Sequence, residues 1–220
     1  NFGSAPFYKG TSGHRIPAHQ LAFMADFIGE LVRRSSVPVG VNCLRNDSAS
    51  AVGIAAAVGA SFVRVNVHTG AYVTDQGLIE GEAAETLRYR DAVGAQDVAI
   101  LADVLVKHAV PLGPLTMKDA VKDTLVRGLA DGVIVTGQAT GASVNEEAIS
   151  AALEATTADR LFIGSGLRPD TGAAWAPRLR GAIVGTWLKV DGQLHQPVDP
   201  SRVREFATSV AGRWAQGVSE

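Results

Sequence analysis

Three polar side chains alternate with valines in the stretch FVRVNVHTG, residues 62–70. Successive side chains of a β-strand point to opposite faces, so Arg64, Asn66 and His68 share one face. An arginine and a carboxamide on that face suit the binding of a polar or anionic substrate, and a histidine can move a proton near neutral pH. We therefore predict that Arg64 and Asn66 bind substrate and that His68 is catalytic. The alternative for a single histidine is a structural role.

A second strand-like run, VAILADVLV at 98–106, carries Asp103, and Lys107 follows it with the same strand parity. A carboxylate and an ammonium group at one site can perturb each other's pKa values and act as base and acid. We predict Asp103 and Lys107 as catalytic groups, with a Schiff-base role open to Lys107. The structural alternatives are an ion pair between Asp103 and Lys107 or one between Arg64 and Asp103.

Other polar residues gather where predicted strands end, and they complete the set of candidates for substrate binding. Asp47 has a second interpretation, because an aspartate directly before a predicted helix serves as its N-cap. Cys43 has the opposite strand parity and is predicted to be inert core. The further substrate-binding candidates are Asn42, Asp47, Asp75, Thr136 and Thr140.

Two glycine-containing turns follow the last two predicted strands. Gly164, Ser165 and Gly166 close one repeat unit, and Gly185 and Thr186 close the next. Glycine lets a main chain approach a ligand closely, and main-chain N–H groups in such turns bind phosphate in many barrels. These five residues are predicted to bind a phosphate group.

All these candidates lie at the ends of β-branched runs that alternate with amphipathic, alanine-rich stretches. Repeated β-α units of this kind favour a parallel sheet covered by helices. The predicted strands are 38–44, 62–67, 98–106, 132–137, 161–166 and 181–186, and the predicted helices are 18–34, 48–58, 80–93, 117–129, 145–156, 170–178 and 200–216.

Polar residues on one strand face distinguish a barrel from an open sheet. Both faces of an open sheet pack on helices and should be apolar, whereas the inner face of a (β/α)₈ barrel can line a site near the carboxyl ends of its strands. We therefore predict a TIM-type (β/α)₈ barrel. The segment TGAYVTDQGLIEG, 69–81, is predicted to be a long, glycine-punctuated loop that acts as a mobile lid.

Composition excludes several classes of protein. The 220-residue chain has a formal net charge of −2 with interspersed charges, and 6% of its residues are aromatic, so neither nucleic-acid binding nor a general affinity for anionic membranes is expected. No apolar run approaches the roughly 18 residues of a membrane span. The single cysteine excludes an intrachain disulfide and favours the reducing cytoplasm. No ligand motif of fixed spacing indicates a metal or cofactor, and a homo-oligomer is the expected state.

Several long motifs occur in the order that is typical of one protein family. They are PVGVNCLRNDSASAVGIAAAVGASFVRVNVHTGAYVTDQGLIEGEAAETLRYR, LADVLVKHA, VTGQATG, IGSG and IVGTWLKVDG followed by PVDPSRV. Together they strongly resemble the BtpA family, also described as photosystem I or membrane complex biogenesis proteins and including SgcQ-like proteins. The resemblance spans essentially the whole chain. It implies one TIM-type barrel domain over 1–220, close to the ribulose-phosphate-binding group, that lacks the first strand and helix of the family.

Two functions follow from these features. The first is an enzyme that acts on a phosphorylated sugar or nucleotide-like small molecule by lyase, isomerase or glycosidic-bond chemistry. The second, implied by the family, is a non-catalytic biogenesis or stability factor for a membrane protein complex such as photosystem I, which would use an outer surface for a peripheral link to that complex. The unusual residues lie on strand faces rather than on helices, which favours the enzyme.

Overall fold

The computed structural model describes residues 15–74, 77–106, 109–137 and 146–214. The chain divides into two compact units. Unit 1 comprises 1–103, 109–114 and 123–132, and unit 2 comprises 104–108, 115–122 and 133–220. We describe each unit by itself.

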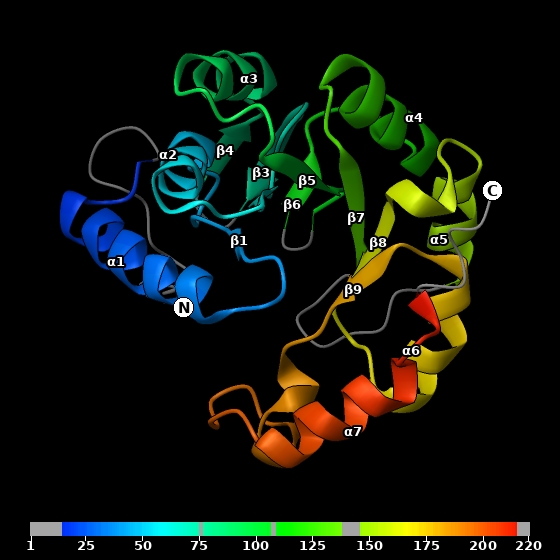
Figure 1. Ribbon diagram of the computed structural model, residues 1–220. Coiled ribbons are helices and arrows are strands. Elements are labelled where there is room, and N and C mark those ends of the chain that lie inside the picture. Colours follow the sequence, from blue (N-terminus) through cyan, green and yellow to red (C-terminus); the bar gives the residue numbers. More distant parts are fainter. Residues whose placement is uncertain (1–14, 75–76, 107–108, 138–145, 215–220) are drawn as a thin grey trace. The chain divides into compact units, whose positions relative to one another are not determined.

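Three parallel strands form the sheet of unit 1 (Figure 1). Strand β1 (Gly40–Val41) pairs with β2 (Phe62–Val65), and β2 pairs with β5 (Ala99–Val104). All three strands coincide with predicted ones but are shorter at their ends. The alternation predicted for β2 is present, because Val63 and Val65 are buried while Arg64 is only partly buried.

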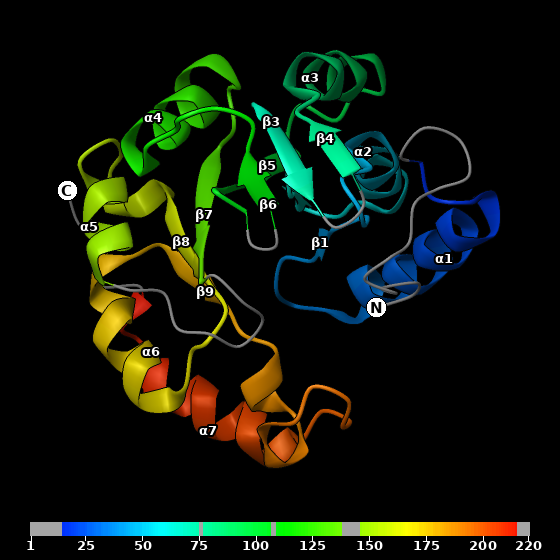
Figure 2. The same cartoon turned by 180° about the vertical axis from the view of Figure 1, so that it is seen from behind.

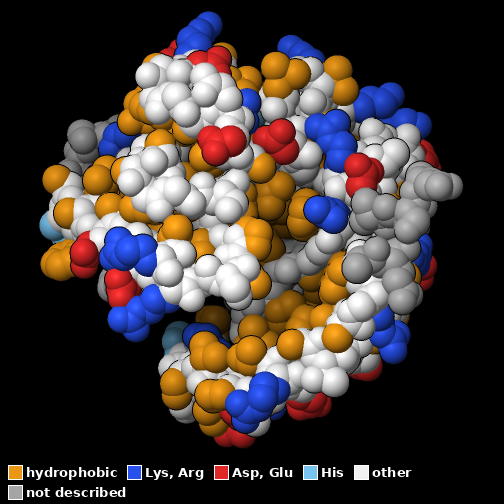
Figure 3. All heavy atoms as spheres, in the orientation of Figure 1, with side chains coloured by type: hydrophobic (Ala, Val, Ile, Leu, Met, Phe, Trp, Pro, Cys, Tyr) orange, Lys and Arg blue, Asp and Glu red, His pale blue; other side chains and the backbone are white. Residues whose placement is uncertain are grey.

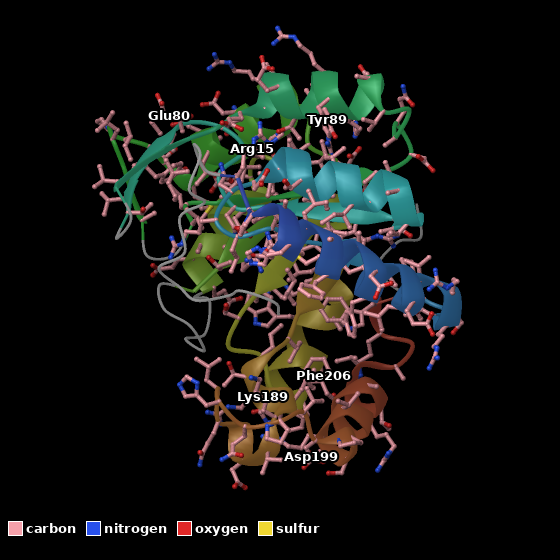
Figure 4. The ribbon with its side chains drawn as sticks, turned by 90° about the vertical axis from the view of Figure 1, so that its left-hand side faces the viewer. Arg15, Glu80, Tyr89, Lys189, Asp199 and Phe206 are labelled. Carbon is pink, nitrogen blue, oxygen red and sulfur yellow. The ribbon has the colours of Figure 1, made fainter. Side chains whose placement is uncertain are left out.

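Three helices accompany these strands: α1 (Ala18–Arg34), α2 (Ser48–Val58) and α3 (Ala83–Ala92). Helix α2 packs on β2 and lies between α1 and α3 (Figure 1). Its ends are set by sequence, since Asp47 caps the first turn and Gly59 ends the helix with a φ of 74°. Figure 4 shows Tyr89 on α3, and a Cβ at Gly53 of α2 would lie 3.1 Å from the Tyr89 hydroxyl.

The segment predicted as a loop over 69–81 contains a β-hairpin (Figure 2). Strand β3 (Ala71–Thr74) pairs antiparallel with β4 (Gly77–Glu80) and with β6 (Ala109–Pro111). The prediction missed two short alternating runs, AYVT and GLIE, whose facing residues Tyr72 and Ile79 are both buried. Cross-strand burial of this kind stabilises a hairpin and accounts for the difference.

The helix predicted over 117–129 has two parts. Helix α4 (Met117–Lys122), in unit 2, is followed in the chain by a π-helical segment, η1 (Asp123–Arg127), in unit 1. The N–H of Gly128 donates to the carbonyl of Asp123, five residues earlier, which is the π-helical spacing. Sequence periodicity does not distinguish such a segment from an α-helix.

Unit 2 repeats the parallel arrangement. Strand β8 (Leu161–Gly164) pairs with both β7 (Gly132–Thr136) and β9 (Gly181–Ile183). Its helices are α5 (Glu146–Leu153), α6 (Pro169–Trp175) and α7 (Pro200–Val210), with short 3₁₀ segments at 158–160, 176–178, 186–188 and 190–192.

Helix α7 is anchored by capping and by aromatic packing. Asp199 accepts from the N–H of Ser201 at its start. Phe206 of α7 (Figure 4) packs against the ring of Trp187, with centroids 6.1 Å apart. It also approaches α6 so closely that a Cβ at Gly172 would lie 3.0 Å from its ring. These contacts fix α7 against the rest of unit 2.

Candidate functional site

Four of the predicted side chains form one hydrogen-bonded group at the carboxyl ends of β1, β2 and β5. Arg64 donates from Nε and Nη2 to the two carboxylate oxygens of Asp103, at 3.0 and 2.9 Å. Asn66 donates from Nδ2 to the same carboxylate at 2.8 Å. Asn42 donates from Nδ2 to Asn66 Oδ1 at 3.2 Å. We call these four residues the polar cluster.

The polar cluster joins neighbouring strands and is only partly open to solvent. Arg64 lies on β2 and Asp103 on the neighbouring strand β5, so their ion pair, one of the alternatives expected from the sequence, connects adjacent strands. The Asp103 side chain is fully buried, whereas 20% of the Arg64 side chain is exposed. A bidentate arginine–carboxylate pair of this geometry is rigid. Ligands can therefore reach the arginine but not the carboxylate.

Asp103 serves as an acceptor within this group. Its two oxygens receive three N–H donors, two from Arg64 and one from Asn66. Such donors favour the ionised carboxylate and orient the groups that donate them. The contacts of Asp103 thus suit a positioning role and include the ion pair with Arg64, which the sequence left open as an alternative to proton transfer.

His68 lies apart from the polar cluster. Strand β2 ends at Val65, so the regular alternation that would align His68 with Arg64 is not maintained. His68 is 1% exposed, and its Nε2 bonds to the carbonyl of Gly128 at 2.8 Å. Burial lowers the pKa of His68. The hydrogen bond to Gly128 raises this pKa by a smaller amount, so the net shift is downward. Its contacts are those of a structural histidine.

Asp47 acts as a helix cap, which was the second interpretation of this residue. One carboxylate oxygen accepts from the N–H of Ser50 at 3.0 Å and from Arg15 at 3.0 Å. The other accepts from the N–H of Ile16 at 2.7 Å and from the Ser50 hydroxyl at 2.6 Å. With both oxygens occupied and the side chain fully buried, Asp47 fastens the segment before α1 to the start of α2.

The predicted phosphate-binding residues follow two neighbouring strands of unit 2. Gly164 ends β8, and a Cβ there would lie 2.9 Å from Thr136 Cγ2, so the close approach of β7 requires glycine. Ser165 and Gly166 have φ angles of 79° and 71°, and the Ser165 N–H donates to Ile183 of β9 at 3.3 Å. This N–H holds the two strands together and is not available to a ligand.

The remaining predicted residues lie close to these turns or outside the described residues. Gly185 and Thr186 open a 3₁₀ segment just beyond β9, and a Cβ at Gly185 would meet nothing within 4 Å. Thr136 ends β7, and its buried hydroxyl has no hydrogen-bond partner within the described ranges. The predicted residues Asp75, Lys107 and Thr140 lie outside the described residues.

Asn46 is a buried polar residue that the sequence prediction missed. Its side chain accepts from the N–H of Val67 at 2.7 Å and donates to the carbonyl of the same residue at 2.8 Å. It also donates to the carbonyl of Glu80 at 3.4 Å. Its φ is 64°, in the left-handed region that asparagine adopts more readily than most residues. An asparagine shortly after a predicted strand was therefore the signal that the sequence offered. Asn46 thereby fixes the chain that follows β2.

A cavity of about 350 Å³ lies elsewhere in unit 1. It is lined by small side chains and Asp97 from the segments that precede β2 and β5, so it lies at the amino ends of these strands, opposite the polar cluster. Volume alone therefore does not identify the functional site. Its lining residues are Ala55, Ala56, Gly59, Ala60, Ser61, Val93, Gly94, Ala95, Asp97 and Val98.

Charge and ligating groups limit what the described residues can bind. Side chains of both signs are dispersed over the face shown in Figure 3, with no continuous basic surface. Within the described ranges, no group of three or more His, Cys, Asp or Glu residues could hold a metal ion. No helix in that part of the chain is long and apolar enough to cross a bilayer. Burial raises the pKa of Cys43 to about 12, so its thiol is inert as a nucleophile.

Known proteins similar to this chain were found by sequence. The sequence model of the BtpA family matches residues 1–212. The photosystem I biogenesis protein BtpA of Synechocystis sp. is 46% identical, over 96% of this chain and 72% of that protein. An uncharacterized protein of Pyrococcus furiosus is 44% identical, over 93% of this chain and 74% of that protein. The putative sgc region protein SgcQ of Escherichia coli is 29% identical, over 89% and 72%.

Solved structures show the fold. N-(5'-phosphoribosyl)anthranilate isomerase from Pyrococcus furiosus aligns with a TM-score of 0.53 at 14% identity, over 92% of this chain and 84% of that one. A structure described as native KDPGal aligns with a TM-score of 0.51 at 17% identity, over 90% and 76%. Together with the parallel strands and alternating helices, these likenesses identify the fold as a TIM-type (β/α) barrel, as predicted. At such identities they say nothing about activity.

Proposed function

The chain belongs to the BtpA family, and from that premise we propose that it is an enzyme acting on a phosphorylated sugar or nucleotide-like small molecule. The polar cluster is the observation that carries the proposal. It places an arginine, two carboxamides and a buried carboxylate at the carboxyl ends of three parallel strands. Barrels of this class carry their active sites at those ends.

The proposed roles follow from the contacts of each residue. Arg64, Asn66 and Asn42 bind and orient the substrate, and Asp103 holds Arg64 and Asn66 in place. Lys107, which follows β5 in the sequence, is the proposed proton-transfer group for lyase, isomerase or glycosidic-bond chemistry. A satisfied hydrogen-bond network holds its members rigidly, which suits the positioning of a substrate.

The phosphate group is assigned to the turns after β8 and β9 in unit 2. Support comes from Gly166, Gly185 and Thr186, which lie beyond the carboxyl ends of two neighbouring parallel strands. Gly185 is open to its surroundings, since an added Cβ would meet no atom within 4 Å. Exposed main-chain N–H groups at such turns favour anions.

Thermal unfolding in the presence of phosphorylated compounds tests this proposal. Ribose 5-phosphate at 100 times its Kd would stabilise the folded chain by about 2.7 kcal/mol, seen as a rise in Tm of several degrees. Gly185→Asp should abolish that rise, because it adds a negative charge without a steric clash. Gly113→Asp, at another glycine with no atom near its Cβ, is the matched control and should retain it. The absence of stabilisation by any sugar or nucleotide phosphate would refute the proposal.

A second function is favoured by the name of one relative and by the surface of α1. The Synechocystis relative is named as a photosystem I biogenesis protein. Phe23 of α1 is 64% exposed, which suits contact with an apolar segment of a membrane-complex subunit. In that case Phe23→Glu would impair assembly of the complex and Asn42→Leu would not. The enzyme proposal predicts instead that Asn42→Leu weakens the binding of phosphorylated compounds and that the substitution on α1 does not.

A further inference from the structure

The charge of Asp103 fixes the orientation of both carboxamides in the polar cluster. An ionised carboxylate only accepts hydrogen bonds, so Asn66 must turn its nitrogen toward Asp103, at 2.8 Å. Its oxygen then faces Asn42 and accepts from Asn42 Nδ2 at 3.2 Å. Asn42 Nδ2 donates as well to the main-chain carbonyl of Arg64, at 2.9 Å. Two acceptors therefore hold the nitrogen of Asn42.

Two groups of the polar cluster remain for a ligand. The Nδ2 of Asn42 donates both of its hydrogen bonds within the cluster. Its Oδ1 is therefore an acceptor with no partner within the described ranges. Arg64 has committed Nε and Nη2 to Asp103, so its Nη1 keeps two N–H donors. Both side chains are only partly buried, so a ligand can reach them.

The charge balance decides which part of a ligand these groups suit. Arg64 already pairs with the carboxylate of Asp103 at 2.9 Å, so a phosphate would have to share this arginine with a buried anion. The Oδ1 of Asn42 would also repel an anion. A hydroxyl group, in contrast, can accept from Arg64 Nη1 and donate to Asn42 Oδ1.

We infer that the polar cluster recognises the hydroxyl groups of a sugar or other polyol, not the phosphate group. The inference rests on the proposed function and names the part of the substrate that the polar cluster binds. A hydroxyl bound in this way replaces its bonds to water, and a ligand that lacks it leaves the donor and acceptor of the site unpaired. Loss of one such group typically lowers affinity about tenfold.

Calorimetric titration of the full chain with three probes tests the inference. The probes are ribose 5-phosphate, ethyl phosphate, which has the charge but no hydroxyl group, and ribose, which has the hydroxyl groups but no phosphate. We expect ribose 5-phosphate to bind at least about tenfold more tightly than ethyl phosphate. Asn42→Leu should lower this affinity ratio about tenfold.

The outcomes separate this inference from the proposed function. Equal affinity of the wild-type chain for the two phosphates would overturn the inference and leave a phosphate-binding function standing. Binding of ribose with no gain from its phosphate would support the inference and overturn the phosphate assignment. Binding of none of the three would overturn both. If Asn42→Leu does not fold, the wild-type ratio decides.

Discussion

Arg64→Met and Asp103→Asn remove opposite partners of one ion pair, and the structure predicts unequal costs. In Arg64→Met the carboxylate of Asp103, whose side chain is fully buried, loses two N–H donors and stays out of reach of water. Breaking a buried pair in this way costs about 3–5 kcal/mol of unfolding free energy. In Asp103→Asn the unpaired charge lies on Arg64, which is 20% exposed and can be hydrated. We expect about 1–3 kcal/mol for that change.

Urea unfolding, monitored by circular dichroism, measures the loss of unfolding free energy in both variants. The midpoint urea concentrations can be compared directly if the dependence of the unfolding free energy on urea concentration is unchanged. The double variant Arg64→Met with Asp103→Leu should be more stable than Arg64→Met alone, because neither charge is left buried. Arg88→Met is the control. Arg88 pairs with Glu85 at a surface site where both side chains are more than 70% exposed, so we expect a change within about 0.5 kcal/mol. A cost below about 1 kcal/mol for Arg64→Met, or a larger cost for Asp103→Asn, would refute the reasoning.

Three further predictions concern buried groups of unit 1. Burial lowers the pKa of His68 below 6.5, so the unfolded chain takes up a proton there first as the pH falls. The wild type should therefore lose stability below about pH 6.5 relative to His68→Gln, and parallel stability curves between pH 7.5 and 5 would contradict this. With its pKa raised to about 12, Cys43 should resist a thiol reagent at pH 8 until the chain unfolds, and rapid labelling of the folded chain would exclude its burial. Gly81→Ala places a Cβ 2.5 Å from the carbonyl oxygen of His68 and should cost more than about 2 kcal/mol, whereas Gly113→Ala, with open space around it, should stay within about 0.5 kcal/mol in the same assay.

The repeated β-α pattern predicted the main elements. Buried parallel strands are rich in apolar residues, and helices that cover a sheet have one apolar face, so both leave a periodic pattern in the sequence. Helices α1 and α2 have the predicted bounds, and all six predicted strands are present within the described residues in shortened form. Strand parity also predicted that Arg64 and Asn66 would share a face, and both reach Asp103. These features depend on local periodicity, which a sequence carries directly.

Features that depend on tertiary contacts were not predictable in this way. The pairing of β3 with β6 joins segments more than 30 residues apart, so 69–81 was interpreted as a loop. His68 does not share the environment of Arg64, as strand alternation predicted, because β2 ends before it and its ring bonds to the carbonyl of Gly128. Asp47 gains its bonds to Arg15 and Ile16 from a segment over 30 residues earlier. In each case a distant partner, which the local sequence pattern does not reveal, decided the surroundings of the residue.

A crystal structure of the full chain with ribose 5-phosphate tests the central claim most directly. We predict that Arg64 and Asn66 both bond to Asp103 and that a ligand hydroxyl lies within about 3.2 Å of both Asn42 Oδ1 and Arg64 Nη1. A ligand phosphate at that position, or a ligand bound without contact to any of these four residues, would contradict the account.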